Sequence, residues 1–144
     1  MLPDNLREHA VAAAVEAFDA DAISGGNFDR KELTLEVSAP KIASVCGFLK
    51  YDQTFVRLSS VTAVDRYPAE PRFEVVYQLF SIPRKQYLRL KVPLSGADAR
   101  VDSLVPVWPG ANFFEREVFD LFGVRFDEHP NLARIMMQIG RAHV

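Results

Sequence analysis

Apolar and polar residues alternate along this chain with two different periods. A period near 3.6 residues predicts helices over residues 3–18 and 41–50, whereas alternation at every second residue predicts strands. The strand pattern covers residues 32–38, 55–64, 72–82 and 87–92. Gly25-Gly26, between the first helix and the first strand, predicts a turn. The order of elements predicts a two-layer α+β fold, in which a mixed sheet of four or five strands carries the N-terminal helices on one face.

A short C-terminal helix is predicted from Asn112 to Phe122, with both ends marked in the sequence. Asn112 follows the turn residues Pro109-Gly110 and is a predicted N-cap. Glu115, three residues later, completes the pattern of a capping box. Gly123 is the expected left-handed stop at the other end.

A helical wheel divides this helix into two faces. Phe114, Val118, Leu121 and Phe122 share one arc and are predicted to pack on the domain. The other side holds charges and spare aromatic residues, namely Phe113, Arg116 and Asp120, with Phe119 off to the side. Exposed aromatic residues beside charges favour a partner-binding surface. The alternative is an ordinary solvated helix in which Arg116 and Asp120 form a weak i,i+4 pair.

Residues 84–91 form a second charged pattern, on a predicted hairpin. Its basic members surround one tyrosine: Arg84, Lys85, Tyr87, Arg89 and Lys91. One interpretation is a surface for phosphate groups or nucleic acid. The other is a solvated edge strand whose charges prevent further strand addition.

Composition restricts the function further. A chain of 144 residues with 49% apolar residues is expected to form one domain. Its net charge of −2 gives no general attraction to nucleic acid, and its longest apolar runs are shorter than a bilayer span, so a soluble cytoplasmic protein is expected. Cys46 is the only cysteine, which excludes an internal disulfide and a thiolate-held iron-sulfur cluster or zinc site. We expect Cys46 to be a small core residue.

The three histidines, His9, His129 and His143, lack metal-ligand spacing. Residues 126–137 are interpreted as an arm laid along a partner protein. Within it His129 has three interpretations: a structural hydrogen-bonding group at a turn, a general acid or base, and an interface contact. No redox centre is expected in this chain.

The C-terminal half closely resembles a known family signature. The matching residues are Ala111 to Gly123, Phe126, His129-Pro130-Asn131-Leu132 and Arg134-Ile135-Met136-Met137. They are similar to the signature of the C subunit of proton-translocating NADH-quinone oxidoreductase, respiratory complex I. Phe113 stands where the family often has tryptophan, and Ala133 where a basic residue is usual. A weaker resemblance in residues 61–65 and 73–77 extends the match over most of the chain.

The resemblance implies a non-redox structural or assembly subunit of the peripheral arm, on the cytoplasmic side of the bacterial inner membrane. The whole complex passes electrons from NADH through FMN and iron-sulfur clusters to quinone, and none of these cofactors is expected in this chain. The implied partners are the large D subunit of the quinone module and neighbouring iron-sulfur subunits, with no nucleic acid. The implied interface residues are Phe113, Glu115, Arg116, Glu117, Phe119, Asp120, Gly123, His129, Pro130 and Arg134.

Two alternatives stay open at this point. The first is the equivalent subunit of a related membrane-bound hydrogenase or other quinone-linked dehydrogenase. The second is a stand-alone enzyme that uses Asp120, His129 and Arg134.

The last residues carry an unusual pattern. Ile139-Gly140-Arg141-Ala142-His143-Val144 is the translation of ATCGGAAGAGCACACGTC, a common sequencing adapter. We therefore expect residues 1–137 to be the domain that resembles the complex I family and residues 138–144 to be a non-native tail.

Overall fold

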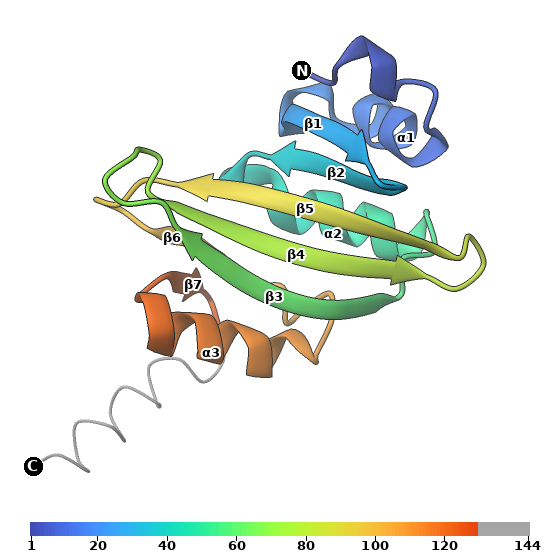
Figure 1. Ribbon diagram of the computed structural model, residues 1–144. Helices are drawn as coiled ribbons and strands as arrows, with labels where there is room; N and C mark the ends of the chain where they lie inside the picture. Colours follow the sequence, from blue (N-terminus) through green and yellow to red (C-terminus); the bar gives the residue numbers. More distant parts are fainter. Residues whose placement is uncertain (130–144) are drawn as a thin grey trace, which may run out of the picture.

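The computed structural model describes residues 1–129, which surround a five-stranded mixed sheet (Figure 1). The strand order is β1-β2-β5-β4-β3. Neighbouring strands are antiparallel except for β2 and β5, which run parallel. The strands are β1 (Ile23–Asp29), β2 (Glu32–Val37), β3 (Arg57–Asp65), β4 (Phe73–Ser81) and β5 (Gln86–Leu94).

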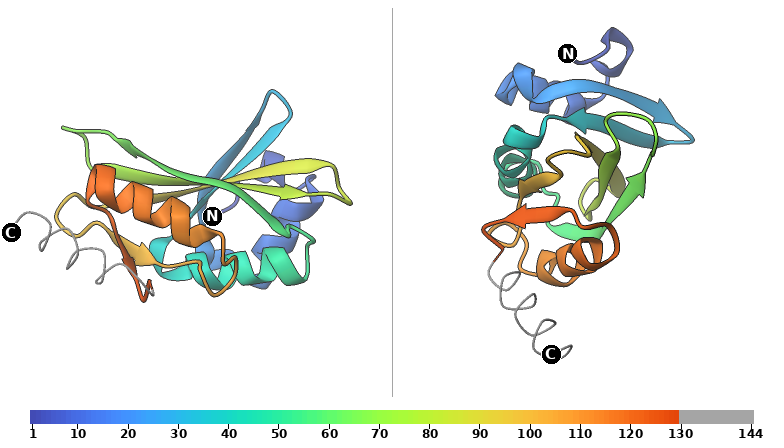
Figure 2. Two further views of the ribbon diagram at one scale, coloured as in Figure 1. Left: turned by 90° about the horizontal axis from the view of Figure 1, so that it is seen from below. Right: turned by 90° about the vertical axis from the view of Figure 1, so that its left-hand side faces the viewer.

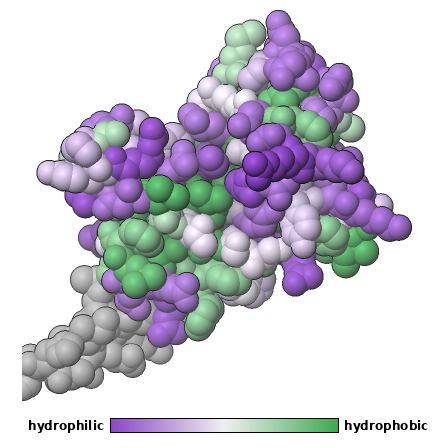
Figure 3. Space-filling model, in the orientation of Figure 1, coloured by the Kyte–Doolittle hydropathy of each residue, from purple (hydrophilic) through white to green (hydrophobic). Residues whose placement is uncertain are grey.

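Two helices, α1 (Ala10–Phe18) and α2 (Ile42–Tyr51), cover one face of the sheet (Figure 2). The other face is open, with hydrophilic side chains over much of it and apolar ones near β3 (Figure 3). The third helix, α3 (Ala111–Phe122), lies beside the edge strand β3. A small parallel pair, β6 (Arg100–Asp102) with β7 (Arg125–Asp127), flanks α3 in the sequence.

The core lies between the sheet and the two N-terminal helices. Alternate residues of β4 point into it, so that Val75, Tyr77 and Leu79 are fully buried. From the helices, Val15 and Val45 are equally buried. Burial of each such side chain contributes about 1.5–3 kcal/mol, so the alternation in sequence becomes the main stabilising layer. Cys46 belongs to this core, as predicted, and burial raises the pKa of its thiol.

The predicted fold class is confirmed, and two element predictions are wrong. The helix expected over residues 3–18 is divided into a short 3-10 turn, Asp4–Leu6, and α1, because the backbone at His9 is extended. Gly25 and Gly26 do not form a turn; they lie within β1, which the apolar pattern does not reveal. A Cβ atom at Gly26 would lie 2.6 Å from the carbonyl oxygen of Thr34, so the close pairing with β2 explains the glycine there.

The basic hairpin is formed by β4 and β5, but β5 is not an edge strand. It lies between β2 and β4, so the interpretation of its charges as edge protection is wrong. Its two central basic residues are instead paired with carboxylates on neighbouring strands. Arg89 lies 2.7 Å from Glu32, and Lys91 lies 3.7 Å from Glu74.

Candidate functional site

The helix α3 begins after Gly110 and ends at Gly123, and it carries the signature residues. Gly123 has a φ of 74°, so the predicted left-handed C-terminal stop is confirmed. The predicted N-cap is wrong. Gly110 occupies that position, and no side chain caps the helix there. The side-chain oxygen of Asn112 is buried instead, without a hydrogen-bond partner among the described residues.

Glu115 is fully buried and does not complete a capping box. Its Oε1 accepts a hydrogen bond of 2.6 Å from Ser103 Oγ, and its Oε2 accepts one of 2.7 Å from the backbone N–H of Leu104. These bonds tie the inner side of α3 to the connection that follows β6. Burial raises the pKa of Glu115 to about 7, although both hydrogen bonds favour the ionised form. The residue is therefore an internal anchor rather than a surface charge.

This anchoring rotates α3 relative to the wheel prediction. The buried positions are Ala111, Glu115 and Val118, which centre the inner arc about 40° away from the predicted one, at 100° per residue. Leu121 was predicted to face the core, but 71% of its side chain is exposed. The apolar pattern misplaces it because the hydrogen bonds of a buried carboxyl group decide the orientation.

The exposed side of α3 combines apolar and charged side chains. We call it the α3 surface and define it by Phe113, Arg116, Glu117, Asp120 and Leu121. Phe113 is 67% exposed and meets Phe114 edge to face, with ring centroids 6.2 Å apart. Phe119, the other spare aromatic residue, is only half-buried.

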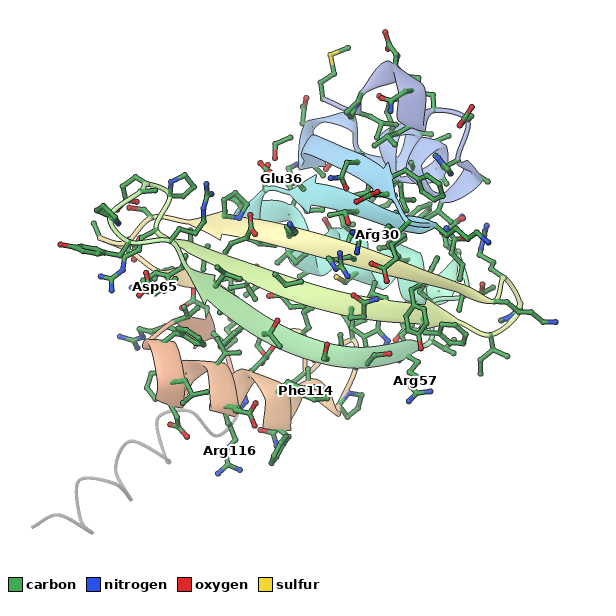
Figure 4. All side chains as sticks on the ribbon, in the orientation of Figure 1. Arg30, Glu36, Arg57, Asp65, Phe114 and Arg116 are labelled. Atoms are coloured by element: carbon green, nitrogen blue, oxygen red, sulfur yellow. The ribbon has the colours of Figure 1, made fainter. Side chains whose placement is uncertain are left out.

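The polar members of the α3 surface line a shallow hollow with Phe113. Among residues 1–129, no ion pair involves any of the three charged members, so the pair between Arg116 and Asp120 that the alternative of a solvated helix includes is not formed. Figure 4 shows Arg116 pointing away from the body of the domain, whereas Phe114 lies between α3 and β3. Within the described residues, the three charges therefore have no oppositely charged group in contact.

His129, the last described residue, is buried behind α3. Its Nε2 donates to the backbone oxygen of Asn112 at 3.3 Å and lies 3.9 Å from Glu115 Oε1. Burial lowers the pKa of this imidazole, so its neutral form is favoured. This geometry fits the first of the three interpretations of His129, a structural hydrogen-bonding group at a turn. Pro130, Arg134 and the rest of the predicted arm lie outside the described residues, as do residues 138–144.

The described residues do not assemble the candidate enzyme site. Asp120 is exposed on the α3 surface, whereas the side chain of His129 is fully buried. No group of three or more His, Cys, Asp or Glu residues within 1–129 is placed to hold a metal ion. No helix in the same range is long and apolar enough to cross a membrane.

Two solved structures share this fold, and one of them is a chain of a respiratory membrane complex. The trypsin-resistant fragment (1-134) of Nqo5 superposes with a TM-score of 0.72 at 26% identity, over 82% of this chain and 96% of that one. A chain of the membrane-bound sulfane sulfur reductase, an archaeal respiratory membrane complex, gives 0.74 at 26% identity, over 88% and 74%. The fold is thus one that occurs in a chain of a respiratory membrane complex.

Sequence comparison narrows this class. The model of the "Respiratory-chain NADH dehydrogenase, 30 Kd subunit" family matches residues 35–143. The C subunit of NADH-quinone oxidoreductase from Geobacter sulfurreducens is 45% identical over 89% of this chain and 79% of its own length. The same subunit from Cereibacter sphaeroides is 41% identical over 99% and 71%. The chain belongs to this family, and the resemblance described above is confirmed. It is a subunit of NADH-quinone oxidoreductase, a membrane-associated, multi-subunit respiratory complex.

Proposed function

We propose that this chain docks neighbouring subunits of the peripheral arm through the α3 surface and takes no part in electron transfer itself. One observation carries the proposal: exposed apolar side chains lie beside charges that form no ion pair within residues 1–129. Apolar anchors supply most binding energy in such interfaces, and charges set the orientation. Phe113 and Leu121 are the anchors, and Arg116, Glu117 and Asp120 fix the register.

The partners in this proposal are the large D subunit of the quinone module and the neighbouring iron-sulfur subunits, on the cytoplasmic side of the membrane. FMN, NADH, quinone and the clusters are held by those other chains. The composition of this chain supports that division, because an iron-sulfur cluster needs several thiolates and Cys46 is a single, buried cysteine. No catalytic centre is assigned to this chain.

The buried residues of the signature have a different role in this proposal. Glu115 and His129 hold the helix and the start of the arm in place, and Gly123 ends the helix. Pro130 and Arg134 extend the interface along the arm. The signature thus combines residues that make contacts with residues that position them.

The test is a pull-down with the tagged full chain from detergent-solubilised bacterial membranes. NADH-dependent quinone reduction is measured in the eluate. Arg116→Glu should lower the recovered activity at least tenfold, as expected for an oriented charge at an interface. The matched control is Arg66→Glu, since Arg66 is also exposed but lies in the loop after β3.

Both variants must keep the thermal unfolding midpoint of the unaltered chain. Equal recovery of activity with Arg116→Glu and Arg66→Glu would contradict docking through α3. An unfolded Arg116→Glu variant would contradict the exposed position of this side chain on α3.

A second candidate is the equivalent subunit of another membrane-bound respiratory complex, such as a hydrogenase. The similarity to a chain of the sulfane sulfur reductase favours keeping it, because the same fold occurs in that complex. Neighbouring genes distinguish the two candidates. Genes for NADH-binding subunits support the first, and a gene for a nickel-site hydrogenase subunit supports the second.

A further inference from the structure

One end of the five-stranded sheet gathers basic residues from three separate segments. The β1–β2 turn, the β4–β5 turn and the start of β3 all lie there, because β2 and β5 are parallel while the other pairs are antiparallel (Figure 1). We call this region the hairpin end. It is defined by Arg30, Lys31, Arg57, Arg84 and Lys85, all of which are exposed.

The cations of the hairpin end differ from the other basic residues of the hairpin in their acidic neighbours. Among residues 1–129, none of the five lies within ion-pair distance of a carboxylate. Arg89 and Lys91, further along β5, are both paired. Within the described range, the nearby acidic residues without an ion pair are Asp29 and Asp52. The five cations outnumber them, so this end is positive although the net charge of the whole chain is −2. Positive charge without an acidic partner in the described range, from three separate segments, is therefore concentrated at the hairpin end.

Apolar side chains are exposed between these cations. Val56 is 51% exposed, Ile82 64% and Tyr87 48%. The ring of Tyr87 rests against Phe80, with centroids 4.6 Å apart, and is thereby held in position. Figure 3 shows apolar groups beside hydrophilic ones at this end of the sheet. A purely solvated end has no need of such side chains, whereas a binding surface uses them.

The cationic side chains are also kept at some cost in backbone energy. Lys85 has a φ of 51°, and Arg30 and Lys31 have φ values of 51° and 67°. Glycine or asparagine is favoured in this left-handed region, and strained positions concentrate where a side chain is used. Arg84 is oriented in advance, since its guanidinium donates to the backbone oxygen of Gln53 at 3.1 Å and to its Oε1 at 2.8 Å.

We propose that the hairpin end is a second docking surface, which binds an acidic and partly apolar segment of another protein chain. Carboxylates match guanidinium and ammonium groups, and apolar residues of the same segment would cover Ile82 and Tyr87. A nucleic acid is disfavoured, because the chain as a whole is negative and so has no general attraction to a phosphate backbone. This surface lies on other elements than α3, so the inference goes beyond the proposed function.

The test places a photo-crosslinking benzoylphenylalanine at position 87 of the full chain, assembled into the complex in bacterial membranes. Irradiation should link position 87 to a peptide of another subunit that is rich in Asp and Glu. The control is the same probe at Tyr67, which is 73% exposed at the opposite end of the sheet. Mass spectrometry identifies the linked peptide, and the Tyr67 probe should not link to it.

Charge variants then test the cations directly. Arg84→Glu/Lys85→Glu should lower the crosslinking yield about tenfold, since two attractive surface contacts become repulsive. Arg66→Glu should leave the yield unchanged. Lys85→Gly relieves the left-handed backbone, so it keeps the fold while removing one cation and should lower the yield less.

Three results would overturn the inference: a crosslink to lipid or nucleic acid, a crosslink to a peptide without acidic residues, and a yield that the charge reversal leaves unchanged. Absence of any crosslink, in a complex that still contains the chain, would also overturn it. That last result would leave docking through α3 intact, because assembly itself is then observed.

Discussion

Glu115 lies where the connection after β6, the helix α3 and the residues after β7 meet. Ser103 and Leu104 donate to its carboxyl group, and His129 approaches it at 3.9 Å. Burial is the main reason why the pKa of the Tyr77 phenol, on β4, is raised. The nearby negative charge of Glu115 raises it further. Because Glu115 is desolvated, its pKa is raised to about 7, and its neutral form is favoured at any pH below that value.

This raised pKa makes stability depend on pH. Below the unfolded value of 4.5 the contribution of Glu115 is fully present, and it is lost as pH rises through about 7. Glu115→Gln should remove this dependence, because the amide stays neutral. The free energy of unfolding of the unaltered chain, relative to the variant, should therefore fall by on the order of 3 kcal/mol between pH 4.5 and 7.5. Urea denaturation of both proteins across this range measures it.

The comparison with the variant is needed because His129 makes stability depend on pH in the opposite direction. Its pKa is lowered from 6.5, so its contribution is present above that pH and is lost as pH falls through the folded value. The two groups partly cancel in the unaltered chain. A relative stability that stays constant with pH would show that Glu115 titrates normally, in contact with water.

A second prediction concerns Gly123: replacing it with alanine should change the free energy of unfolding in the opposite direction to the same replacement at Gly47. Gly123→Ala should destabilise the chain by about 1 kcal/mol, because φ is 74° and no neighbouring atom lies within 4 Å of the added Cβ. The cost is thus conformational and not steric. Gly47→Ala, within α2 and equally free of contacts, should stabilise by about 0.5–1 kcal/mol. Equal effects of the two changes would contradict the left-handed assignment.

At the scale of an element, the rotation of α3 separates two apolar residues that the wheel groups together. Val118 is 2% exposed and Leu121 is 71% exposed. Val118→Ala should cost about 2 kcal/mol through lost burial and a residual cavity. Leu121→Ala should change the free energy of unfolding by less than about 0.5 kcal/mol. Chemical denaturation distinguishes this orientation from the one in which both residues face the core.

In strand β5, too, the neighbouring elements decide the role of side chains that the local sequence leaves open. Its outward residues are basic, and on an edge they would be protective charges. Because β5 lies between β2 and β4, its carboxylate partners Glu32 and Glu74 come from both neighbours. Each of these partly exposed pairs contributes at most about 1 kcal/mol, so their main effect is to neutralise the open face.

At the scale of the whole molecule, the two proposed surfaces lie on separate elements. The α3 surface lies beyond β3, and the hairpin end lies across the ends of the strands. Combining Arg116→Glu with Arg84→Glu/Lys85→Glu should therefore lower recovery in the pull-down by the product of the separate factors. A loss no larger than that of Arg116→Glu alone would mean that the hairpin end contributes nothing to retention.

The C-terminal sequence carries a prediction that concerns the gene. If residues 138–144 come from adapter sequence, genomic DNA will diverge from the printed sequence near residue 138. Genomic DNA that encodes all of them and a genuine stop codon would refute the idea.

Much of the molecule follows from the sequence alone. The strands near residues 32–38 and 72–82, the helix α2, the stop at Gly123 and the family are all predicted, because periodicity, caps and signature residues are local properties of the chain. The α3 surface is predicted in part. Phe113, Arg116 and Asp120 face outward as expected, since a charge is rarely buried without partners.

Only the tertiary structure decides the remainder. The strand β1 exists because β2 provides its hydrogen-bonding partner, and two glycines by themselves indicate a turn. The parallel pairing of β2 with β5 joins segments more than fifty residues apart and brings both hairpin turns to one end. Glu115 turns inward because Ser103 and Leu104 supply hydrogen bonds there. Each of these outcomes depends on a partner that is distant in sequence, and the local pattern of residues does not contain it.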